Sequence, residues 1–215
     1  MKQKEGGNLV ETLEIAKTNL RHNSLLSIVA AVMLCLITPL LIGTANLDQN
    51  SAAMPLEMFV SLIGIVLLTP VFQPEQNEEI HDLVSSKHCS TEKVYLIRTL
   101  YTVGVVVLLI CLFVVYMQTQ GSDVTMILVF GAAANAIFLG SMGMLVSALT
   151  GNTVIGYMPP FLYYALNIGM GPKLGNFYLF SMTVGNFRVK IWLLAAGVLM
   201  IMVSLLYQIF RRRRM

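Results

Sequence analysis

The sequence is poor in charged residues, which make up 12% of its 215 residues, whereas hydrophobic residues make up 56%. A soluble globular domain carries about 25% charged residues. So few charges cannot cover the surface of a protein that faces water on every side. The composition therefore excludes an ordinary soluble domain and indicates a chain whose surface lies largely in lipid.

Cysteine is scarce as well, and its three occurrences do not suggest a pair. Cys35 and Cys111 lie within apolar runs, Cys89 lies in a polar segment, and no Cys-x-x-Cys pair occurs. Disulfide frameworks, zinc sites and redox motifs depend on such spacings. We therefore expect neither structural disulfides nor a metal site on this chain.

Motifs for catalysis are missing too. An ATPase would need a phosphate-binding Gly-x-x-x-x-Gly-Lys-Ser/Thr loop, and the nearest string, residues 169–173, fails on spacing. A serine protease within the membrane would need a base beside its serine, but the three histidines all lie in polar segments. An enzyme is therefore the weakest interpretation, and no catalytic residue or cofactor is expected on the chain.

Ionisable residues are absent from the centres of the apolar runs. Glu57 and Arg98 stand at the ends of such runs, where a long side chain would reach the membrane interface. Transporters driven by protons or sodium usually carry ionisable groups near the membrane midplane, and voltage sensors carry a series of arginines. The sequence disfavours both classes and indicates a membrane protein without an energy source of its own.

Long apolar runs are what the sequence has in abundance. A transmembrane helix needs about 20 mostly apolar residues, and six runs approach that length. The predicted spans cover about residues 25–43, 56–72, 99–117, 124–149, 153–171 and 191–210. We therefore predict an all-α integral membrane protein with one six-helix domain over 25–210, flanked by tails at 1–24 and 211–215.

The tails predict the orientation of this domain. Residues 8–22 carry one apolar stripe among charged residues, which predicts an amphipathic helix on the membrane surface, with a soluble helical tail as the alternative. Eleven of the 14 lysines and arginines fall on the side of both termini, four of them at 211–214. Cytoplasmic loops carry such an excess, so both termini are expected in the cytoplasm, at the plasma membrane of a prokaryote. Nucleic-acid binding is not expected, because no aromatic or basic surface accompanies the arginines.

Three features within the predicted spans are candidates for packing or for a substrate path. Asn135 is the main polar residue near a span centre, and it would either bond a neighbouring helix or line a path. Pro159 and Pro160 remove two backbone donors and would kink or interrupt their span. Small residues in the fourth span favour close packing within the subunit or between two copies. They are Ala132, Ala136, Gly140, Gly143 and Ser147.

Two segments between the spans carry further predictions. Residues 172–190 are too short and too interrupted by glycine to span, so we expect an interfacial or re-entrant piece on the outer side. The polar stretch 73–98 begins with acidic residues, and Leu83 and Val84 add an apolar stripe at helical spacing. The acidic residues of its first half are Glu75, Glu78, Glu79 and Asp82. Anionic headgroups would repel them, so we expect a short helix that binds a cytoplasmic protein, with a solvated loop as the alternative.

This order of parts resembles the permease subunits of type 2 ABC exporters: an amphipathic N-terminal helix, six spans, an acidic helix between spans two and three, and a re-entrant outer segment before span six. Glu75, Leu83-Val84 and either Lys93 or Arg98 stand where that family has an acidic residue, a leucine-rich turn and a basic re-entry. The run 139–149 is similar to the family's small-residue stretch before span five. The family's Glu-Arg-Glu opening reads Glu75-Gln76-Asn77 here, so no role for an arginine is carried over.

The resemblance implies a half-transporter. A second permease copy or a related permease would complete the substrate path, and cytoplasmic ABC ATPase subunits would dock on the acidic helix and bind ATP and Mg²⁺. Membrane lipids are the remaining partner. The alternative is a non-transporting membrane scaffold or sensor subunit.

Overall fold

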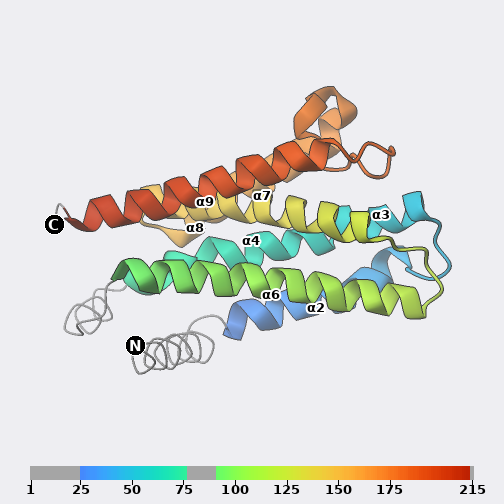
Figure 1. Ribbon diagram of the computed structural model, residues 1–215, viewed down its shortest axis with the longest axis horizontal. Helices are drawn as coiled ribbons and strands as arrows, with labels where there is room; N and C mark the ends of the chain where they lie inside the picture. Colours follow the sequence, from blue (N-terminus) through green and yellow to red (C-terminus); the bar gives the residue numbers. More distant parts are fainter. Residues whose placement is uncertain (1–24, 77–90, 214–215) are drawn as a thin grey trace, which may run out of the picture.

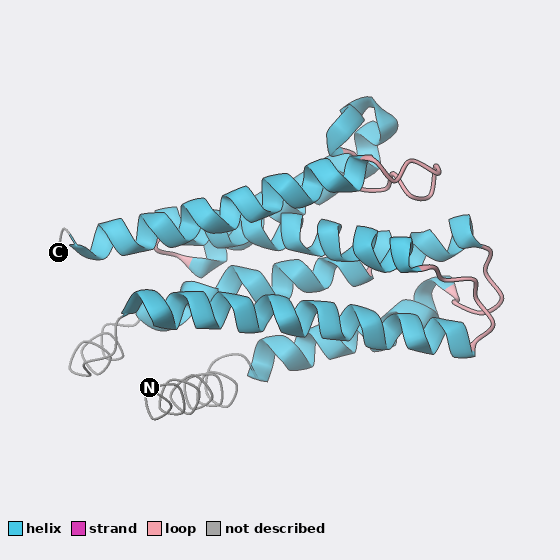
Figure 2. Cartoon of the chain, viewed as in Figure 1, coloured by secondary structure: helices cyan, strands magenta, loops and turns pink. Residues whose placement is uncertain are grey.

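The computed structural model describes residues 25–76 and 91–213, and within these ranges it is helical and contains no strand (Figures 1 and 2). The elements in chain order are α2 (Leu25–Ile42), α3 (Gln49–Met58), η2 (Val60–Leu62), α4 (Ile63–Leu68), η3 (Thr69–Gln76), α6 (Thr91–Thr119), α7 (Met126–Thr150), α8 (Thr153–Met170), η4 (Gly171–Phe177) and α9 (Val189–Arg213). The prediction of an all-α chain is confirmed for the described residues.

Five helical stretches are long and apolar enough to cross a membrane. They are Leu25–Ile42, Gln49–Gln73, Val94–Thr119, Met126–Thr150 and Val189–Arg211. The helix α8 is not among them, because two prolines, three tyrosines and an asparagine dilute the apolar character of its 18 residues. Several membrane-type helices are thus established, and the sixth span stays a prediction.

Successive helical stretches run in alternating directions along one long axis (Figure 1). The loops before α3 and before α7 meet at one end, where the Asn46 amide donates to the Gln120 carbonyl at 3.0 Å and the Asp123 amide donates to the Leu47 carbonyl at 2.9 Å. We call this the outer end, after the predicted orientation. The opposite, inner end holds the end of η3, the first turn of α6 and the last turn of α9 (Figure 1).

The helix α7 lies at the centre of the bundle, and its small residues explain why. A Cβ atom built on Gly64 of α4 would lie 1.8 Å from the Ala136 carbonyl oxygen, and one built on Gly140 would lie 2.3 Å from the Gly64 carbonyl oxygen. The two backbones therefore touch at this crossing. Close backbone approach is how membrane helices gain contact where no hydrophobic effect drives them together.

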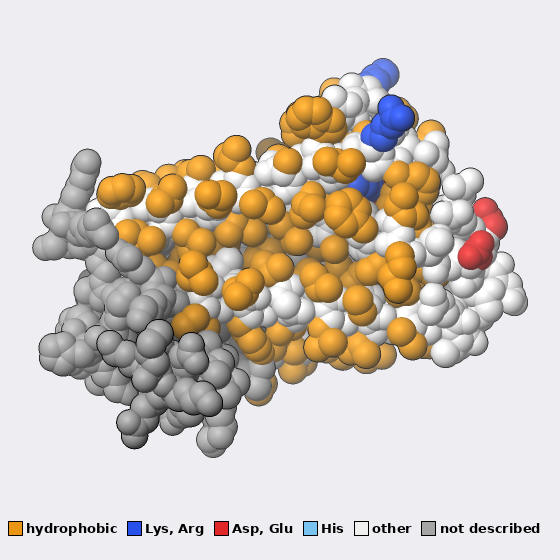
Figure 3. Space-filling view, in the orientation of Figure 1, with side chains coloured by type: hydrophobic (Ala, Val, Ile, Leu, Met, Phe, Trp, Pro, Cys, Tyr) orange, Lys and Arg blue, Asp and Glu red, His pale blue; other side chains and the backbone are white. Residues whose placement is uncertain are grey.

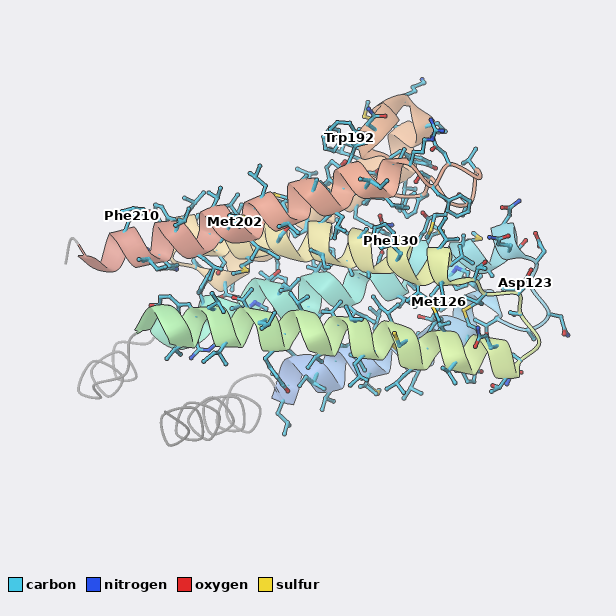
Figure 4. All side chains as sticks on the ribbon, in the orientation of Figure 1. Asp123, Met126, Phe130, Trp192, Met202 and Phe210 are labelled. Carbon is cyan, nitrogen blue, oxygen red and sulfur yellow. The ribbon has the colours of Figure 1, made fainter. Side chains whose placement is uncertain are left out.

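Apolar side chains cover the outside of the bundle along most of its length, whereas the described charged side chains visible on this face gather toward the outer end (Figure 3). Phe130, Met202 and Phe210 project outward from α7 and α9 and are 44%, 58% and 59% exposed (Figure 4). The outward face of α2 is also apolar, with Leu26 and Leu40 more than 80% exposed. Such a surface is suited to lipid rather than water.

Candidate functional site

A buried ion pair joins two helices near the outer end. The Glu57 carboxylate on α3 and the Lys190 ammonium in the first turn of α9 are 2.5 Å apart, and their side chains are 0% and 1% exposed. Both residues belong to stretches that are apolar enough to span. Removing two charged groups from water costs free energy unless each group is paired and hydrogen-bonded. The other contacts of Glu57 and Lys190 therefore show whether both groups are satisfied.

Both charged groups have a full set of partners. The Glu57 Oε1 atom accepts from the Met182 amide at 3.0 Å, and Oε2 accepts from the Thr183 amide at 3.2 Å. The Lys190 ammonium also donates to the Asn135 Oδ1 atom at 2.9 Å and to the Leu179 carbonyl. An ammonium group has three donors, and with Glu57 all three are used.

These contacts hold residues 179–183 in place. This segment lies between η4 and α9, and we call it the strap. The Asn135 Nδ2 atom donates to the Leu179 carbonyl at 2.9 Å, and the Leu179 amide donates to the Asn167 Oδ1 atom of α8 at 2.8 Å. A Cβ atom on Gly131 would lie 2.2 Å from the Met182 Sδ atom. The missing side chain at Gly131 thus leaves room for the Met182 side chain of the strap against α7.

The neighbouring segment of the second span is irregular. The α-helix α3 ends at Met58, and the 3₁₀ turn η2 follows before the helix resumes as α4. The Tyr164 hydroxyl of α8 donates to the Met58 carbonyl at 2.5 Å, which satisfies a backbone acceptor beside the break. Beside the strap, burial and then the Glu57 carboxylate raise the pKa of the Tyr178 phenol.

The structure corrects the expected position of Glu57. Glu57 was expected to reach the membrane interface from the end of a span. It is buried against Lys190 instead. The reason is the strap, which folds back over the ends of α3 and α9 and excludes water from both groups. A glutamate and a lysine at the edges of two apolar runs were the only signal in the sequence.

The segment expected to be interfacial or re-entrant has two unlike parts. The 3₁₀ turn η4 is largely exposed, with Phe177 46% exposed. The strap behind it is buried, since Leu179, Ser181 and Met182 are at most 2% exposed. Trp192 projects beside η4 and is 59% exposed (Figure 4).

The other predicted residues within the spans lie in helix contacts. Asn135 donates to the strap and accepts from the Lys190 side chain of the neighbouring helix α9. The helix α8 runs without interruption through Pro159, which is half-buried, and Pro160, which is buried. The small residues of α7 are all buried inside the chain, against α4, η3, α8 or the core. They are Ala132, Ala136, Gly140, Gly143 and Ser147.

The residues of the predicted docking helix lie outside the described ranges. They are Glu78, Glu79, Asp82, Leu83 and Val84. Glu75 falls in the last turn of η3, where only the backbone is described. The N-terminal segment 8–22 also lies outside these ranges.

The arrangement holds the strap in place against α3, α7, α8 and α9. No group of three or more potential metal ligands occurs within residues 25–76 and 91–213. No protein-family model, curated protein or solved structure matches the chain. The geometry of the described residues and the order of parts in the sequence therefore carry the functional argument.

Proposed function

We propose that this chain is the membrane-spanning permease subunit of an ATP-driven exporter resembling the type 2 ABC class. A second copy or a related permease would complete the substrate path, and separate cytoplasmic ATPase subunits would bind ATP and Mg²⁺. On this proposal the protein lies in the plasma membrane of a prokaryote with six spans, α8 included, and with both termini in the cytoplasm.

The observation that supports the proposal most is the shared position of three chain segments at the inner end. The polar stretch 73–98, which we call the acidic loop, includes the end of η3 and the start of α6. Both lie at the same end of the bundle as the last turn of α9, which leads into the last of the terminal arginines (Figure 1). The arginines favour the cytoplasmic side for this end. A soluble ATPase would therefore meet the acidic loop on the side where ATP is present.

The acidic loop would have two kinds of contact with the ATPase. Leu83 and Val84 would be the buried anchors, and anchors at the centre of an interface carry most of its binding energy. The carboxylates would steer the encounter and set the register, because rim charges are screened by water and salt. They are Glu75, Glu78, Glu79 and Asp82.

The orientation can be tested with single cysteines in a chain whose three native cysteines are replaced by serine. Gln120→Cys, at an exposed position of the outer end, is expected to react with a membrane-impermeant maleimide added to intact cells. Ser86→Cys in the acidic loop is expected to react only after the cells are opened. The reverse labelling pattern would exclude cytoplasmic docking on the loop.

Coupling can be tested by reconstitution with the ATPase that co-purifies in mild detergent. Leu83→Asp is expected to abolish stimulation of ATP hydrolysis by the permease, because losing a central anchor costs about 2 kcal/mol or more. It should leave membrane insertion unchanged, since residue 83 lies outside the predicted spans. Glu79→Lys is the matched control on the same loop and is expected to have a smaller, salt-dependent effect.

The same experiment separates the exporter from the alternative, a non-transporting scaffold or sensor subunit. An exporter subunit is expected to co-purify with an ATPase and with a second permease. A chain that purifies alone, or whose Leu83→Asp variant stimulates as well as the unmutated chain, would contradict the proposal.

A further inference from the structure

The strap is held by side chains of other elements rather than by regular secondary structure. Within it, the amides of Leu179, Met182 and Thr183 donate to side-chain oxygens of α8 and α3. Its carbonyl at Leu179 accepts from α7 and α9. The strap can therefore leave the bundle by breaking these hydrogen bonds and lifting Leu179, Phe180 and Met182 out of the apolar core, without unwinding α3, α7, α8 or α9.

Two glycines flank the strap and are suited to act as hinges. Gly175 and Gly185 have φ angles of +57° and +78°, and a Cβ atom on either would meet nothing within 4 Å. Glycine is thus present for its backbone freedom and not for close packing. Hinges are a few loop residues that absorb large changes of φ and ψ, and here one lies on each side of the strap.

The contacts of Glu57 and Lys190 with the strap are charge-assisted, and hydrogen bonds to a charged group are roughly twice as strong as neutral ones. The Glu57 carboxylate accepts from the amides of Met182 and Thr183, and the Lys190 ammonium donates to the Leu179 carbonyl. Removing both charges therefore weakens the contacts that hold the strap against the bundle.

Glu57, the residue of the second span that bonds the strap, lies beside an irregular turn of that span. Glu57 stands one residue before the end of α3, and the 3₁₀ turn η2 follows. A stretch of 3₁₀ helix within a longer helix often marks a hinge. Glu57 therefore stands next to a candidate hinge in the second span.

From these observations we propose that the strap is a lid at the outer end, latched by Glu57, Lys190 and Asn135, which opens and closes while the helix bundle stays folded. The opening needs neither ATP nor a partner. Its use as the outer exit of a transport path rests on the proposed exporter function. Thiol labelling without ATPase tests the lid by itself, so failure of the lid and failure of the exporter proposal are distinguishable.

The reporter for opening is Ser181→Cys in the full chain without native cysteines. Ser181 is 2% exposed in the strap. Ser122→Cys is the matched control, because Ser122 is 6% exposed at the same end but belongs to the loop before α7, where its hydroxyl donates to the Thr44 carbonyl. A maleimide is added to the purified protein in mild detergent, where both ends of the bundle are accessible, and the labelling rate is measured for each reporter.

The latch is released in two ways. Glu57→Gln removes one charge, and Glu57→Gln with Lys190→Met removes both, so that no buried charge is left unpaired. Each change is expected to raise the labelling rate of Ser181→Cys at least tenfold and to leave that of Ser122→Cys within twofold. If the single variant does not fold, the double variant still tests the lid. The unfolding midpoint of each protein is measured to show that it is folded.

Two results would overturn the inference. Equal acceleration at both reporters would mean that the whole outer end loosens. An unchanged rate at Ser181→Cys in the folded double variant would mean that the strap is a fixed part of the bundle.

Discussion

Replacing Lys190 with methionine is expected to lower the free energy of unfolding by about 3–5 kcal/mol, the usual cost of removing one partner of a buried ion pair. Methionine keeps the length of the apolar stem but leaves the Glu57 carboxylate without a counter-charge. The two backbone amides of the strap remain as its donors, and they carry no full charge. The loss is measured by denaturant titration of the purified protein in mild detergent.

The double variant Glu57→Gln with Lys190→Met is the control for this prediction. It removes both charges together, and the amide oxygen of glutamine can still accept a strap amide. We expect it to recover most of the stability that Lys190→Met loses, which a double-mutant cycle reports as a large coupling energy. A double variant that loses the sum of the two single losses would show that the residues act independently.

Substituting alanine for Gly64 is expected to cost about 3 kcal/mol, the upper part of the usual range for overpacking a tight core. The new methyl group would lie 1.8 Å from the Ala136 carbonyl oxygen, 2.4 Å from its carbonyl carbon and 2.7 Å from its Cα atom. All three are backbone atoms, so no side-chain rotation relieves the clash. The helices α4 and α7 must separate, and the unfolding midpoint in detergent should fall.

The matched control is Gly104→Ala on α6. A Cβ atom there meets nothing within 4 Å, so the only effect is the better helix propensity of alanine, worth up to about 1 kcal/mol. Its stability should stay the same or rise slightly. Similar losses in both variants would show that the crossing of α4 and α7 is not the close backbone contact described above.

The helices follow from the sequence because their cause is local. A run of apolar residues must satisfy its own backbone in lipid, and an α-helix does so within the run. The predicted stretch 153–171 is the helix Thr153–Met170, and the predicted stretch 25–43 is Leu25–Ile42. The small residues of α7 likewise predict that another helix packs closely against α7. The sequence does not predict which helix that is, because Gly64 lies on another helix that the pattern does not identify.

The sequence alone also determined the low charge, the apolar surface and the unequal placement of lysine and arginine, since these depend only on residue type and order. Whether the charged residues near the span ends are buried or exposed was decided by the tertiary structure. Glu57 and Lys190 are far apart in the chain, and each by itself is typical of a residue that reaches the interface. Only the packing of α3, α7 and α9 brings them together, and only the folded strap removes their water. Pairing at a distance depends on how helices cross, which no local pattern of residues encodes.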